Sequence, residues 1–531
     1  MKRVIISTLC LCVVVLTASA QFKMSEGSRK VATTVAIIEN MYVDKVDDGK
    51  LAEDAVKALL DKLDPHSTYI SPEEVKDMNE PLEGNFDGIG ISFNLLTDTL
   101  YVIEALPGGP SEKVGLRAGD KILYVNDTLI AGVKKSTKDV MSRLKGPKGT
   151  IVNVKVLRRG INELLDFRIV RDKIPIYSID ATYMVDKNTG YIRIIRFGAT
   201  TSKEFHEALA KLKTQGLENL ILDLEYNGGG YMAPAIDISD DFLDKGKLIV
   251  YTEGSRQPRR DELSTAKGVF EKGKLVIMIN EGSASASEIL SGAVQDWDRG
   301  VIVGRRSFGK GLVQRQIPLP DESMIRLTVA RYYTPTGRSI QKPYTKGDLT
   351  SYNLDVIDRY NKGEMMHADS IHFPDSLKYT TLLNHRTVYG GGGIMPDYFV
   401  PADTSFATDY YKKIWIKSLT LKIAYSEADN HRNDILARYP TSSDFYQKYT
   451  VSQEILDKLI AAGKDENIEY DEEGFNKSKD TFIMQIKAYI GRDIYDTETM
   501  VKVLNDDSET FKKAYEIIKN DKLYNGLLKG K

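Results

Sequence analysis

The spacing of hydrophobic residues changes along the first third of the chain. Over residues 27–63 apolar side chains recur at helical spacing ("VATTVAIIENMY", "LAEDAVKALLDKL"), and this pattern ends in the turn "DPHSTYISPEE". Over residues 84–174 short runs of alternating apolar and polar residues stand between Gly and Pro clusters, with one helical piece at 136–144. These patterns predict an N-terminal helical region at 21–83 and a compact, mostly β module at 84–174.

From residue 175 onwards, runs typical of buried strands alternate with helical segments. In chain order they include "TGYIRIIRF", "TSKEFHEALAKLK", "NLILDLEYNGGG", "KLVIMIN", "SASEILSGAVQDW" and "GVIVG". Such alternation predicts an α/β core with parallel strands in βαβ units, over residues 175–401. A polar insertion at 342–389 interrupts this core, and the charged tail at 402–531 has a helical period without a recognisable motif. We therefore expect a multidomain α/β protein with a helical C-terminal region.

Length and charge limit the classes of partner. A chain of 531 residues is long enough for about three domains. Its 73 Lys and Arg residues nearly balance its 75 Asp and Glu residues, and both signs are interspersed. No basic face for nucleic acid is therefore expected, and the choice of partner must come from a specific site.

The first residues, "MKRVIISTLCLCVVVLTASAQ", have the pattern of a secretory signal peptide over 1–20. A transmembrane anchor is the alternative, but the apolar run from Val4 to Leu16 is shorter than the roughly 20 residues that span a bilayer. Lipidation at Cys10 or Cys12 is a weaker alternative, since both lie inside the apolar run. These are the only cysteines, so the mature chain is expected to be exported to the periplasm or cell envelope without disulfides.

One predicted βαβ unit brings three loops together. A strand at 274–280, a helix at 286–297 and a strand at 300–304 follow one another. The helix advances roughly 18 Å and the strand returns roughly 16 Å, so the loop "RRSFGKG" should come back near the start of the helix. Lys310 would then lie near the serines of "NEGSASASEIL". The loop "NGGG" (227–230) also follows a strand, and its glycines can aim peptide N–H groups at an oxyanion.

A nucleophilic serine needs a base, and none of the 6 histidines lies in these three loops. A lysine can replace histidine if burial lowers its pKa. Each motif is also compatible with a different role. Ser285-Ala-Ser-Glu288 is a capping box, and "GRRSFGK" fits the start of a phosphate-binding loop. However, Gly311 stands where that loop needs Ser or Thr, and a strand follows instead of a helix. No metal-ligand cluster is present in the sequence, and no cofactor is expected.

Taken together, the motifs resemble those of the carboxyl-terminal processing proteases, or tail-specific proteases, which are serine-lysine peptidases. The resemblance covers roughly residues 35–401. The matching segments, in the family's order, are "LDPHSTYISPEE", "FDGIGI", "GLRAGDKIL", "GYIRIIRF", "LILDLEYNGGG", "GSASASEILSGAVQDWDRGVIVGRRSFGKGLVQ", "YYTPTGRSIQ" and "GGGGIMPD".

The resemblance implies roles for individual residues. The family's nucleophile falls on Ser285, its general base on Lys310, and the glutamine that orients the lysine on Gln314. Asp296 matches an aspartate near the site, for which a structural role is at least as good an interpretation.

The resemblance also implies an oxyanion hole built from peptide N–H groups of Gly229 or Gly230 and of Ala286. Here the chain departs from the family, because Glu225 and Gly228 replace an arginine and a proline of the usual loop. The local charge of this loop therefore differs from that of the family.

The β module resembles a PDZ domain. Its loop Gly88, Ile89, Gly90 and Ile91 would hold a free carboxylate, and the next strand would accept a peptide by β-augmentation. The alternative for the two isoleucines is an ordinary core position. The resemblance implies protein or peptide substrates with apolar C-termini, and a PDZ module that gates the active site.

Two rival functions are compatible with the same motifs. The first is a PDZ-based periplasmic adaptor or chaperone without activity, and the second is a hydrolase of small substrates. The insertion is interpreted as a partner surface or a cover over the site, and the oligomeric state is left open.

Overall fold

The computed structural model describes residues 24–96, 98–106 and 108–530. The expected signal peptide at 1–20 lies outside these residues. Within them, no helix is both long and apolar enough to cross a membrane. The chain divides into two compact units, Met1–Leu63 and Asp64–Lys531.

The first unit contains two amphipathic helices, α1 (Glu26–Met41) and α2 (Asp48–Asp61). Each begins at a polar N-cap whose side chain accepts a backbone N–H: Ser25 from Ser28, and Asp47 from Lys50. Such caps stabilise helix starts because the first N–H groups have no partner within the helix. The helices predicted from the apolar spacing are thus present.

The second unit begins with β1 (Thr68–Ile70) and α3 (Pro72–Glu83), followed by a two-stranded antiparallel ribbon of β2 (Asn85–Gly88) and β9 (Asp172–Pro175). Between these two strands lies a β module of the PDZ type. Its sheet has the order β3-β4-β5-β7-β8, with β6 paired to β5. Its elements are β3 (Ile91–Leu96), β4 (Thr99–Ala105), α4 (Pro110–Lys113), β5 (Lys121–Val125), β6 (Thr128–Leu129), α5 (Thr137–Leu144), β7 (Ile151–Leu157) and β8 (Leu165–Val170).

Alternation explains why the module folds as a sheet. Val152, Val154 and Val156 of β7 are buried in its core, whereas Ile151 and Leu157 are exposed. Side chains of a strand point alternately to opposite faces, so the period of two in the sequence places one set inside.

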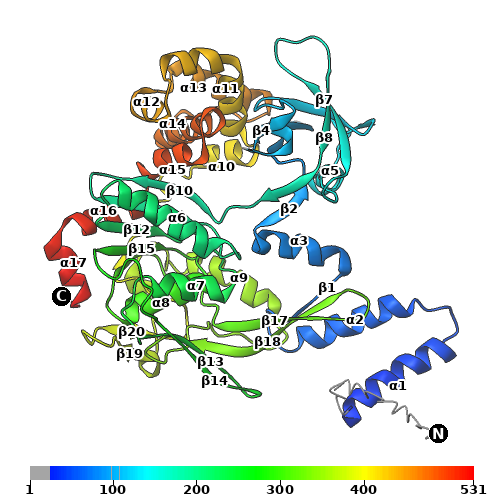
Figure 1. Cartoon of the computed structure of the whole chain (residues 1–531), viewed down its shortest axis with the longest axis vertical. Helices are drawn as coiled ribbons and strands as arrows, with labels where there is room; N and C mark the ends of the chain where they lie inside the picture. The colour runs from blue at the N-terminus through cyan, green and yellow to red at the C-terminus, as the bar shows by residue number, and fades with distance from the viewer. Residues whose placement is uncertain (1–23, 97, 107, 531) are drawn as a thin grey trace, which may run out of the picture. The chain divides into compact units, whose positions relative to one another are not determined.

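The α/β core is built on a six-stranded sheet of order β10-β11-β12-β15-β16-β21 (Figure 1). Only β10 runs antiparallel to its neighbour; the other pairings are parallel. The strands are β10 (Ile179–Met184), β11 (Thr189–Ile194), β12 (Asn219–Asp223), β15 (Leu275–Ile279), β16 (Val301–Gly304) and β21 (Tyr398–Phe399).

Helices cover both faces of this sheet. On one face, Ile277 and Ile279 share a core with α6 (Thr201–Thr214), α7 (Met232–Asp240) and α8 (Ala286–Asp296). On the other, Val276 and Met278 pack with α15 (Thr497–Asn505), α16 (Glu509–Lys519) and α17 (Asp521–Leu528) from the end of the chain. Every residue of β15 is therefore buried, which explains its uninterrupted apolar sequence.

A second, antiparallel sheet lies beside the core sheet and has the order β1-β18-β13-β14, with β17 also paired to β18. It consists, besides β1, of β13 (Leu248–Gly254), β14 (Gln257–Leu263), β17 (Leu312–Pro318) and β18 (Met324–Tyr333). The polar insertion is structured: it contains α9 (Leu349–Asn361), the 3₁₀ turns η1 (Ala368–Ser370) and η2 (Asp375–Leu377), and the hairpin of β19 (Lys378–Thr380) and β20 (Thr387–Tyr389).

The predicted helical C-terminal region consists of α10 (Asp409–Ile416), α11 (Leu419–Arg438), α12 (Ser442–Lys448), α13 (Gln453–Asp465), α14 (Glu472–Ile494), α15 (Thr497–Asn505), α16 (Glu509–Lys519) and α17 (Asp521–Leu528). This region has two parts. Its first helices form a bundle with a core of their own, whereas the last ones complete the core of the α/β sheet.

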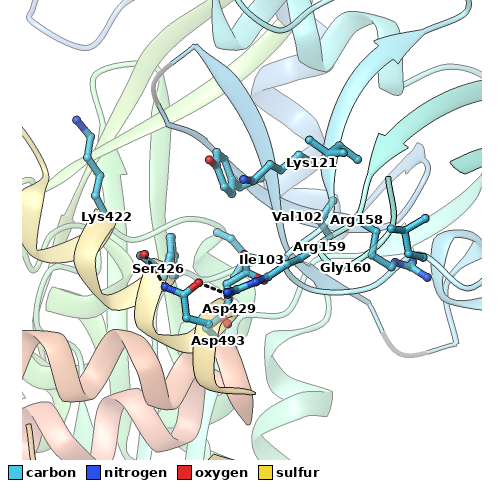
Figure 2. A pocket seen from close by; sticks show the side chains of 16 residues that line it. Val102, Ile103, Lys121, Arg158, Arg159, Gly160, Lys422, Ser426, Asp429 and Asp493 are labelled. Carbon is cyan, nitrogen blue, oxygen red and sulfur yellow. Dashed lines mark hydrogen bonds between the residues drawn. The ribbon is translucent and has the colours of Figure 1, made fainter. Parts of the chain in front are cut away.

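The bundle also contacts the β module. Tyr425 of α11 packs against Ile103, and its hydroxyl oxygen accepts a hydrogen bond from Asn94 at 3.2 Å. Beside this contact lies a cavity of about 490 Å³, whose lining includes Lys121 and Arg158 of the module and Lys422 and Asp429 of α11 (Figure 2). The described fold confirms the predicted class: an N-terminal helical region, a PDZ-like β module, an α/β core with parallel strands and a helical C-terminal region.

Candidate active site

Ser285 occupies a strained turn between β15 and α8. Its φ of 56° and ψ of −110° put a non-glycine residue in a region that L-amino acids rarely adopt. Strain of this kind persists only where the surrounding structure enforces it, and a serine on a sharp strand-to-helix turn presents its hydroxyl at the edge of a sheet. Of the three serines in this turn, only Ser285 has a positive φ.

The two neighbouring serines have other roles. Ser283 donates its hydroxyl proton to the carbonyl of Leu224 at 2.7 Å, and Ser287 donates to the carbonyl of Asn227 at 2.9 Å. Both side chains are buried. Their protons are thus committed to backbone oxygens, which is a structural role.

A single buried carboxylate, that of Glu288, joins the serine turn to the lysine loop. Its Oε2 accepts the peptide N–H of Ser285 at 2.8 Å and that of Lys310 at 2.9 Å. Its Oε1 accepts the N–H of Gly309 at 2.7 Å and the hydroxyl of Ser307. Burial raises the pKa of Glu288, and these hydrogen bonds oppose that effect. The capping box is therefore present, but the same side chain also fixes the loop of the lysine.

Tyr332 of β18 joins the same two residues from another side. Its hydroxyl lies 2.7 Å from the carbonyl oxygen of Lys310 and 3.1 Å from that of Ser285. The tyrosine is buried in the core of the protein. Backbone groups of Ser285 and Lys310 are thus held together by two independent side chains.

The electrostatic environment of Lys310 favours a neutral amine. Burial lowers its pKa to about 8, and the positive charge of Arg326 acts in the same direction. The carboxylates of Glu288 and Asp64 oppose this shift. Desolvation disfavours the charged form of a lysine, so part of the population is unprotonated near neutral pH.

Gln314 of β17 lies opposite Thr328 of β18. Its Nε2 donates to Thr328 Oγ1 over 3.4 Å, and Thr328 Oγ1 donates its only proton to Asp64 at 2.9 Å. Among the described residues, no hydrogen bond joins Gln314 to Lys310. Because the threonine can only accept from the glutamine, the amide presents its nitrogen to Thr328 and keeps Oε1 free as an acceptor.

The turn between α2 and β1 supplies two further residues near Lys310, namely Asp64 and His66. Asp64 accepts the N–H groups of His66 and Ser67 at 2.9 and 3.0 Å. Burial, followed by the positive charge of Lys310, lowers the pKa of His66 to about 4, so this histidine is neutral. The only signal for them in the sequence was the motif "DPHS" within the family resemblance.

The glycine loop lies directly against the serine turn. A Cβ atom on Gly229 would approach the Cβ of Ser285 to 2.8 Å, and the φ of Gly229 is 95°. Its N–H is taken by Asn227 Oδ1 at 2.9 Å. By contrast, no described residue accepts a hydrogen bond from the N–H of Gly230 or of Ala286. Of the three residues expected at the oxyanion hole, Gly230 and Ala286 keep available donors.

Glu225, which stands where the family has an arginine, adds no full negative charge to this loop at neutral pH. Burial raises its pKa to about 8, and the carboxylate of Asp223 adds to this rise. Arg305 is nearby but already forms an ion pair with Glu281 at 2.7 Å. Glu225 is therefore mostly protonated and neutral.

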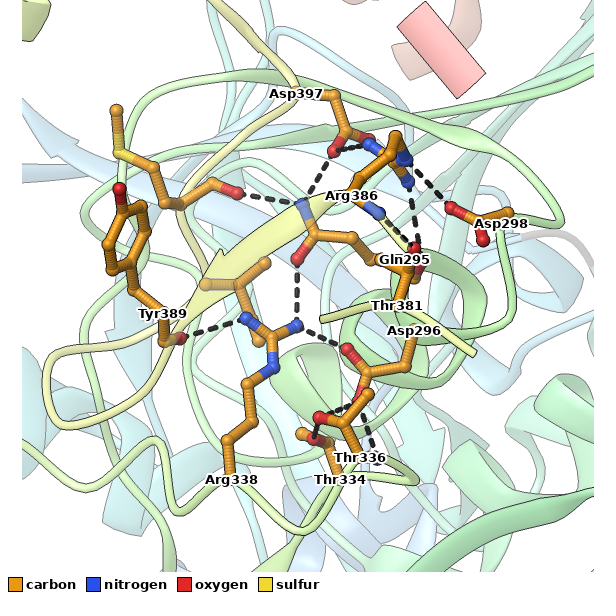
Figure 3. A network of polar contacts seen from close by, with 12 residues as sticks. Gln295, Asp296, Asp298, Thr334, Thr336, Arg338, Thr381, Arg386, Tyr389 and Asp397 are labelled. Carbon is orange, nitrogen blue, oxygen red and sulfur yellow. Dashed lines mark hydrogen bonds and ion pairs between the residues drawn. The ribbon is translucent and has the colours of Figure 1, made fainter. Parts of the chain in front are cut away.

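Asp296 belongs to a separate polar network at the other end of α8 (Figure 3). It pairs with Arg338 at 2.7 Å, and both side chains are fully buried. Its Oδ2 accepts the N–H and the hydroxyl of Thr336 at 3.0 and 2.8 Å. Asp296 stands eleven residues after Ser285, or roughly 16 Å along the helix, and this separation favours the structural interpretation.

The module contains an apolar groove of about 520 Å³ next to the loop Gly88–Ile91. It lies between β3, α5 and α3, and its lining includes Phe86, Ile89, Gly90, Ile91, Phe93, Met141, Leu144, Lys138 and Lys145. Ile89 is also part of the module's core, and the φ of Gly90 is 73°. No described residue accepts a hydrogen bond from the N–H of Ile89 or Gly90. Gly88 is buried at the end of β2 and does not line the groove.

As to metals, the described residues contain no group of three or more His, Cys, Asp or Glu side chains that could hold an ion.

Comparison with known proteins gives four family matches. Residues 188–351 match peptidase family S41, 88–169 a PDZ domain, 14–74 the N-terminal domain of the activating protease CtpB, and 410–496 a family of unknown function.

Curated proteins from other organisms match this chain over more than half of its length. The carboxy-terminal-processing protease of Bartonella bacilliformis is 38% identical over 57% of this chain and 70% of its own length. The carboxy-terminal processing protease CtpA of Bacillus subtilis is 34% identical over 62% of this chain and 71% of its own. Among solved structures, the photosystem II D1 C-terminal processing protease matches 61% of this chain and 93% of its own, with 28% identity and a TM-score of 0.34.

These matches place the chain in a class of enzyme, the PDZ-containing serine peptidases of family S41. Within that class it belongs to the carboxy-terminal processing proteases.

Proposed function

We propose that Ser285 is the nucleophile and Lys310 the general base of this protease. The observation that carries the proposal is that Oε2 of Glu288 binds the backbone of both residues. The lowered pKa of Lys310 and the strained backbone of Ser285 support the same assignment. An adaptor without activity would have no need of either feature.

The chemistry is acyl transfer to water. Neutral Lys310 Nζ removes the proton of Ser285 Oγ, while Oγ forms a bond to the carbonyl carbon of the scissile peptide. The carbonyl oxygen becomes an oxyanion, which the N–H groups of Gly230 and Ala286 stabilise. Collapse breaks the C–N bond, and the Lys310 ammonium gives its proton to the leaving amine. A water molecule then loses a proton to Lys310 and its oxygen attacks the ester carbon. Collapse breaks the C–Oγ bond, the Lys310 ammonium returns the proton to Ser285 Oγ, and the product leaves as a carboxylic acid that ionises in water.

Gln314 orients Lys310 in this proposal. Its Oε1, which Thr328 leaves free, would accept a hydrogen from Nζ. The two-strand pairing of β17 and β18 supports such an arrangement, because it fixes the backbone on which Gln314 stands.

The PDZ module selects the substrate. An apolar carboxyl terminus would enter the groove, with its carboxylate at the N–H groups of Ile89 and Gly90 and its side chain against Ile91, Phe93 and Met141. The apolar lining of this groove supports the proposal. A hydrolase of small substrates would gain nothing from it.

Export is part of the proposal and rests on the sequence of residues 1–20. Proteins with apolar C-termini in the periplasm or cell envelope are thus the proposed substrates. A homo-oligomer or a regulatory partner is compatible with this function.

The test uses the mature chain and an unstructured protein that ends in an apolar tripeptide, with an acidic tail as comparison. The wild type should degrade only the apolar-tailed substrate, and Ser285→Ala or Lys310→Ala should abolish this. Lys346→Ala, at an exposed position, is the matched control. A wild type that binds the apolar tail but leaves it intact would favour the adaptor.

A further inference from the structure

The inserted helix α9 turns one face toward the loop that carries Lys310. Tyr352 and Arg359, two turns apart, are 5% and 4% exposed. Ile357 and Tyr360, which lie off this face, are 55% and 45% exposed. Residues seven positions apart share a helix face, so the buried pair forms a single contact surface.

Arg359 holds the backbone just before the lysine. Its Nη1 donates to the carbonyl of Ser307 at 3.1 Å and its Nη2 to that of Arg306 at 2.7 Å. Its Nε lies 3.4 Å from the carboxylate of Glu364, also in the insertion. Burial lowers the pKa of Arg359 to about 10, so it remains charged at neutral pH. Two charge-assisted hydrogen bonds thus anchor the loop to the insertion.

A second contact involves the two residues directly before Lys310. The ammonium of Lys342 lies 4.0 Å from the ring centroid of Phe308 and 4.1 Å from that of Tyr352, and it pairs with Asp355 at 2.9 Å. The N–H of Lys342 donates to the carbonyl of Gly309 at 2.9 Å. A cation between two rings ties the loop to α9 in a region from which water is largely excluded.

Tyr352 reaches the other side of the lysine through His66. The tyrosine hydroxyl lies 2.9 Å from His66 Nε2, and the two rings meet edge to face at 5.2 Å. The charge of Lys310 acts on His66 and helps to lower its pKa. The same helix therefore contacts both the loop of Lys310 and a residue that faces its side chain.

We propose that the insertion is a positioning element for Lys310, in which Tyr352 and Arg359 hold the 306–310 loop in place and shield the lysine from water. The proposal rests on the Ser285–Lys310 mechanism. Neither residue touches the substrate in this scheme, so both act through Lys310. The insertion thus serves the base of the reaction, which gives a specific form to the cover that the sequence suggested.

Loosening the contact between α9 and the 306–310 loop should increase the hydration of Lys310 and leave the charged groups around it in place. The ionisable groups that face Lys310 are Arg326 from β18, Glu288 from α8, and Asp64 and His66 from the turn before β1. None of these four is on α9. Greater access of water would therefore raise the pKa of Lys310 toward its ordinary value.

The experiment compares Arg359→Met, Arg359→Lys and Tyr352→Phe in the mature chain, with Lys362→Met and Tyr360→Phe as matched controls at exposed positions of the same segment. Values of kcat and KM for an apolar-tailed substrate are measured from about pH 6 to about pH 10. We expect Arg359→Met to lower kcat roughly ten- to hundredfold with little change in KM. The acid limb of the pH profile of kcat should move to higher pH in Arg359→Met. Arg359→Lys should give a limb between those of Arg359→Met and the wild type. Tyr352→Phe should show a smaller loss in the same direction, and the controls none.

The pH profile separates positioning from a purely structural role. Partial unfolding lowers the amount of active enzyme but leaves the acid limb where it is, so a lower kcat with an unmoved limb overturns the proposal. If Arg359→Met does not fold, as judged by its thermal unfolding, Tyr352→Phe provides the test. Lys310→Met is included: activity in that variant overturns the mechanism itself, whereas an inactive Lys310→Met beside a normal Arg359→Met overturns only the positioning role.

Discussion

Ser285 and Lys310 donate their peptide N–H groups to one oxygen atom, Oε2 of Glu288, at 2.8 and 2.9 Å. The other oxygen of that carboxylate binds Ser307 and Gly309. A carboxylate offers about four acceptor sites, so Glu288 is saturated by these four donors. A buried charge with four hydrogen bonds thus sets the distance between the serine turn and the lysine loop.

The first prediction concerns Glu288→Gln. An amide has one acceptor oxygen, and its NH₂ group would face two donors, so buried N–H groups lose their partners. We expect kcat to fall roughly a hundredfold with little change in KM, because the geometry of the reacting pair is disturbed while tail binding is not. Steady-state kinetics on a tail-bearing substrate checks this. An unchanged kcat would contradict the positioning role of Glu288.

The second prediction is the pH dependence of the wild type. Lys310 must lose its proton to act as a base, and its pKa is lowered to about 8. We expect kcat/KM to rise about tenfold per pH unit in the acid range and to level off near pH 8. A profile that is flat between about pH 6 and about pH 9 would argue against a lysine base.

The third prediction is that Lys310→Met stabilises the protein while it abolishes activity. The pKa of Lys310 is about 8 in the folded state, against an ordinary value of 10.5. Between these values the unfolded chain binds more protons, so stability rises with pH through this window, and the full cost of the buried charge applies below about pH 8. Removal of the amine should raise the free energy of unfolding at neutral pH by up to about 3 kcal/mol.

Urea denaturation at neutral pH and at about pH 10 measures this effect. The advantage of the methionine variant should shrink as the pH approaches 10.5, because the folded wild-type lysine is then neutral and the unfolded chain gains progressively less from protonating its own lysine. A methionine variant that is less stable than the wild type at neutral pH would contradict the buried environment of Lys310.

The fourth prediction concerns the ion pair of Asp296 and Arg338, which is fully buried. Arg338→Met leaves a buried carboxylate without its partner, so the free energy of unfolding should fall by about 3–5 kcal/mol. The double variant Arg338→Met with Asp296→Leu should recover part of this loss. Chemical denaturation of the three proteins gives both values. If Asp296 were instead a group that reacts with the substrate, Asp296→Asn would abolish kcat without a loss of stability.

The fifth prediction separates tail reading from catalysis. Met141 lines the groove of the PDZ module and is 36% exposed. Met141→Asp should weaken binding of an apolar tail peptide about tenfold and raise KM with kcat unchanged, because a charge would then face the apolar chain. Val133→Asp, on the same module but outside the groove, is the control. Equal effects of both substitutions would contradict the role of the groove.

The sequence by itself predicted the order of the fold and the elements that carry Ser285 and Lys310. Alternation in β7 and the apolar run of β15 depend on which face of a strand is buried, and capping at Ser25 or Asp47 depends on neighbours within one helical turn. Such short-range patterns are written in the sequence. The single βαβ unit at 274–304 was enough to predict that the lysine loop lies near the serine turn. The lengths of its helix and of its second strand are similar, so the chain after that strand comes back to the start of the helix.

Only the tertiary structure decided what surrounds these residues. Glu288 was recognisable as a cap of its own helix, but its bonds to Gly309 and Lys310 depend on a loop that returns after β16. The contact of Arg359 with the loop of Lys310, and the cover that the last helices give to the core sheet, join segments far apart in the chain. Burial, and with it the pKa of Lys310, is the sum of such long-range contacts. No local pattern of the sequence predicts these contacts. The sequence therefore indicated which residues carry the chemistry, but not the burial and hydrogen bonds that set the pKa of Lys310.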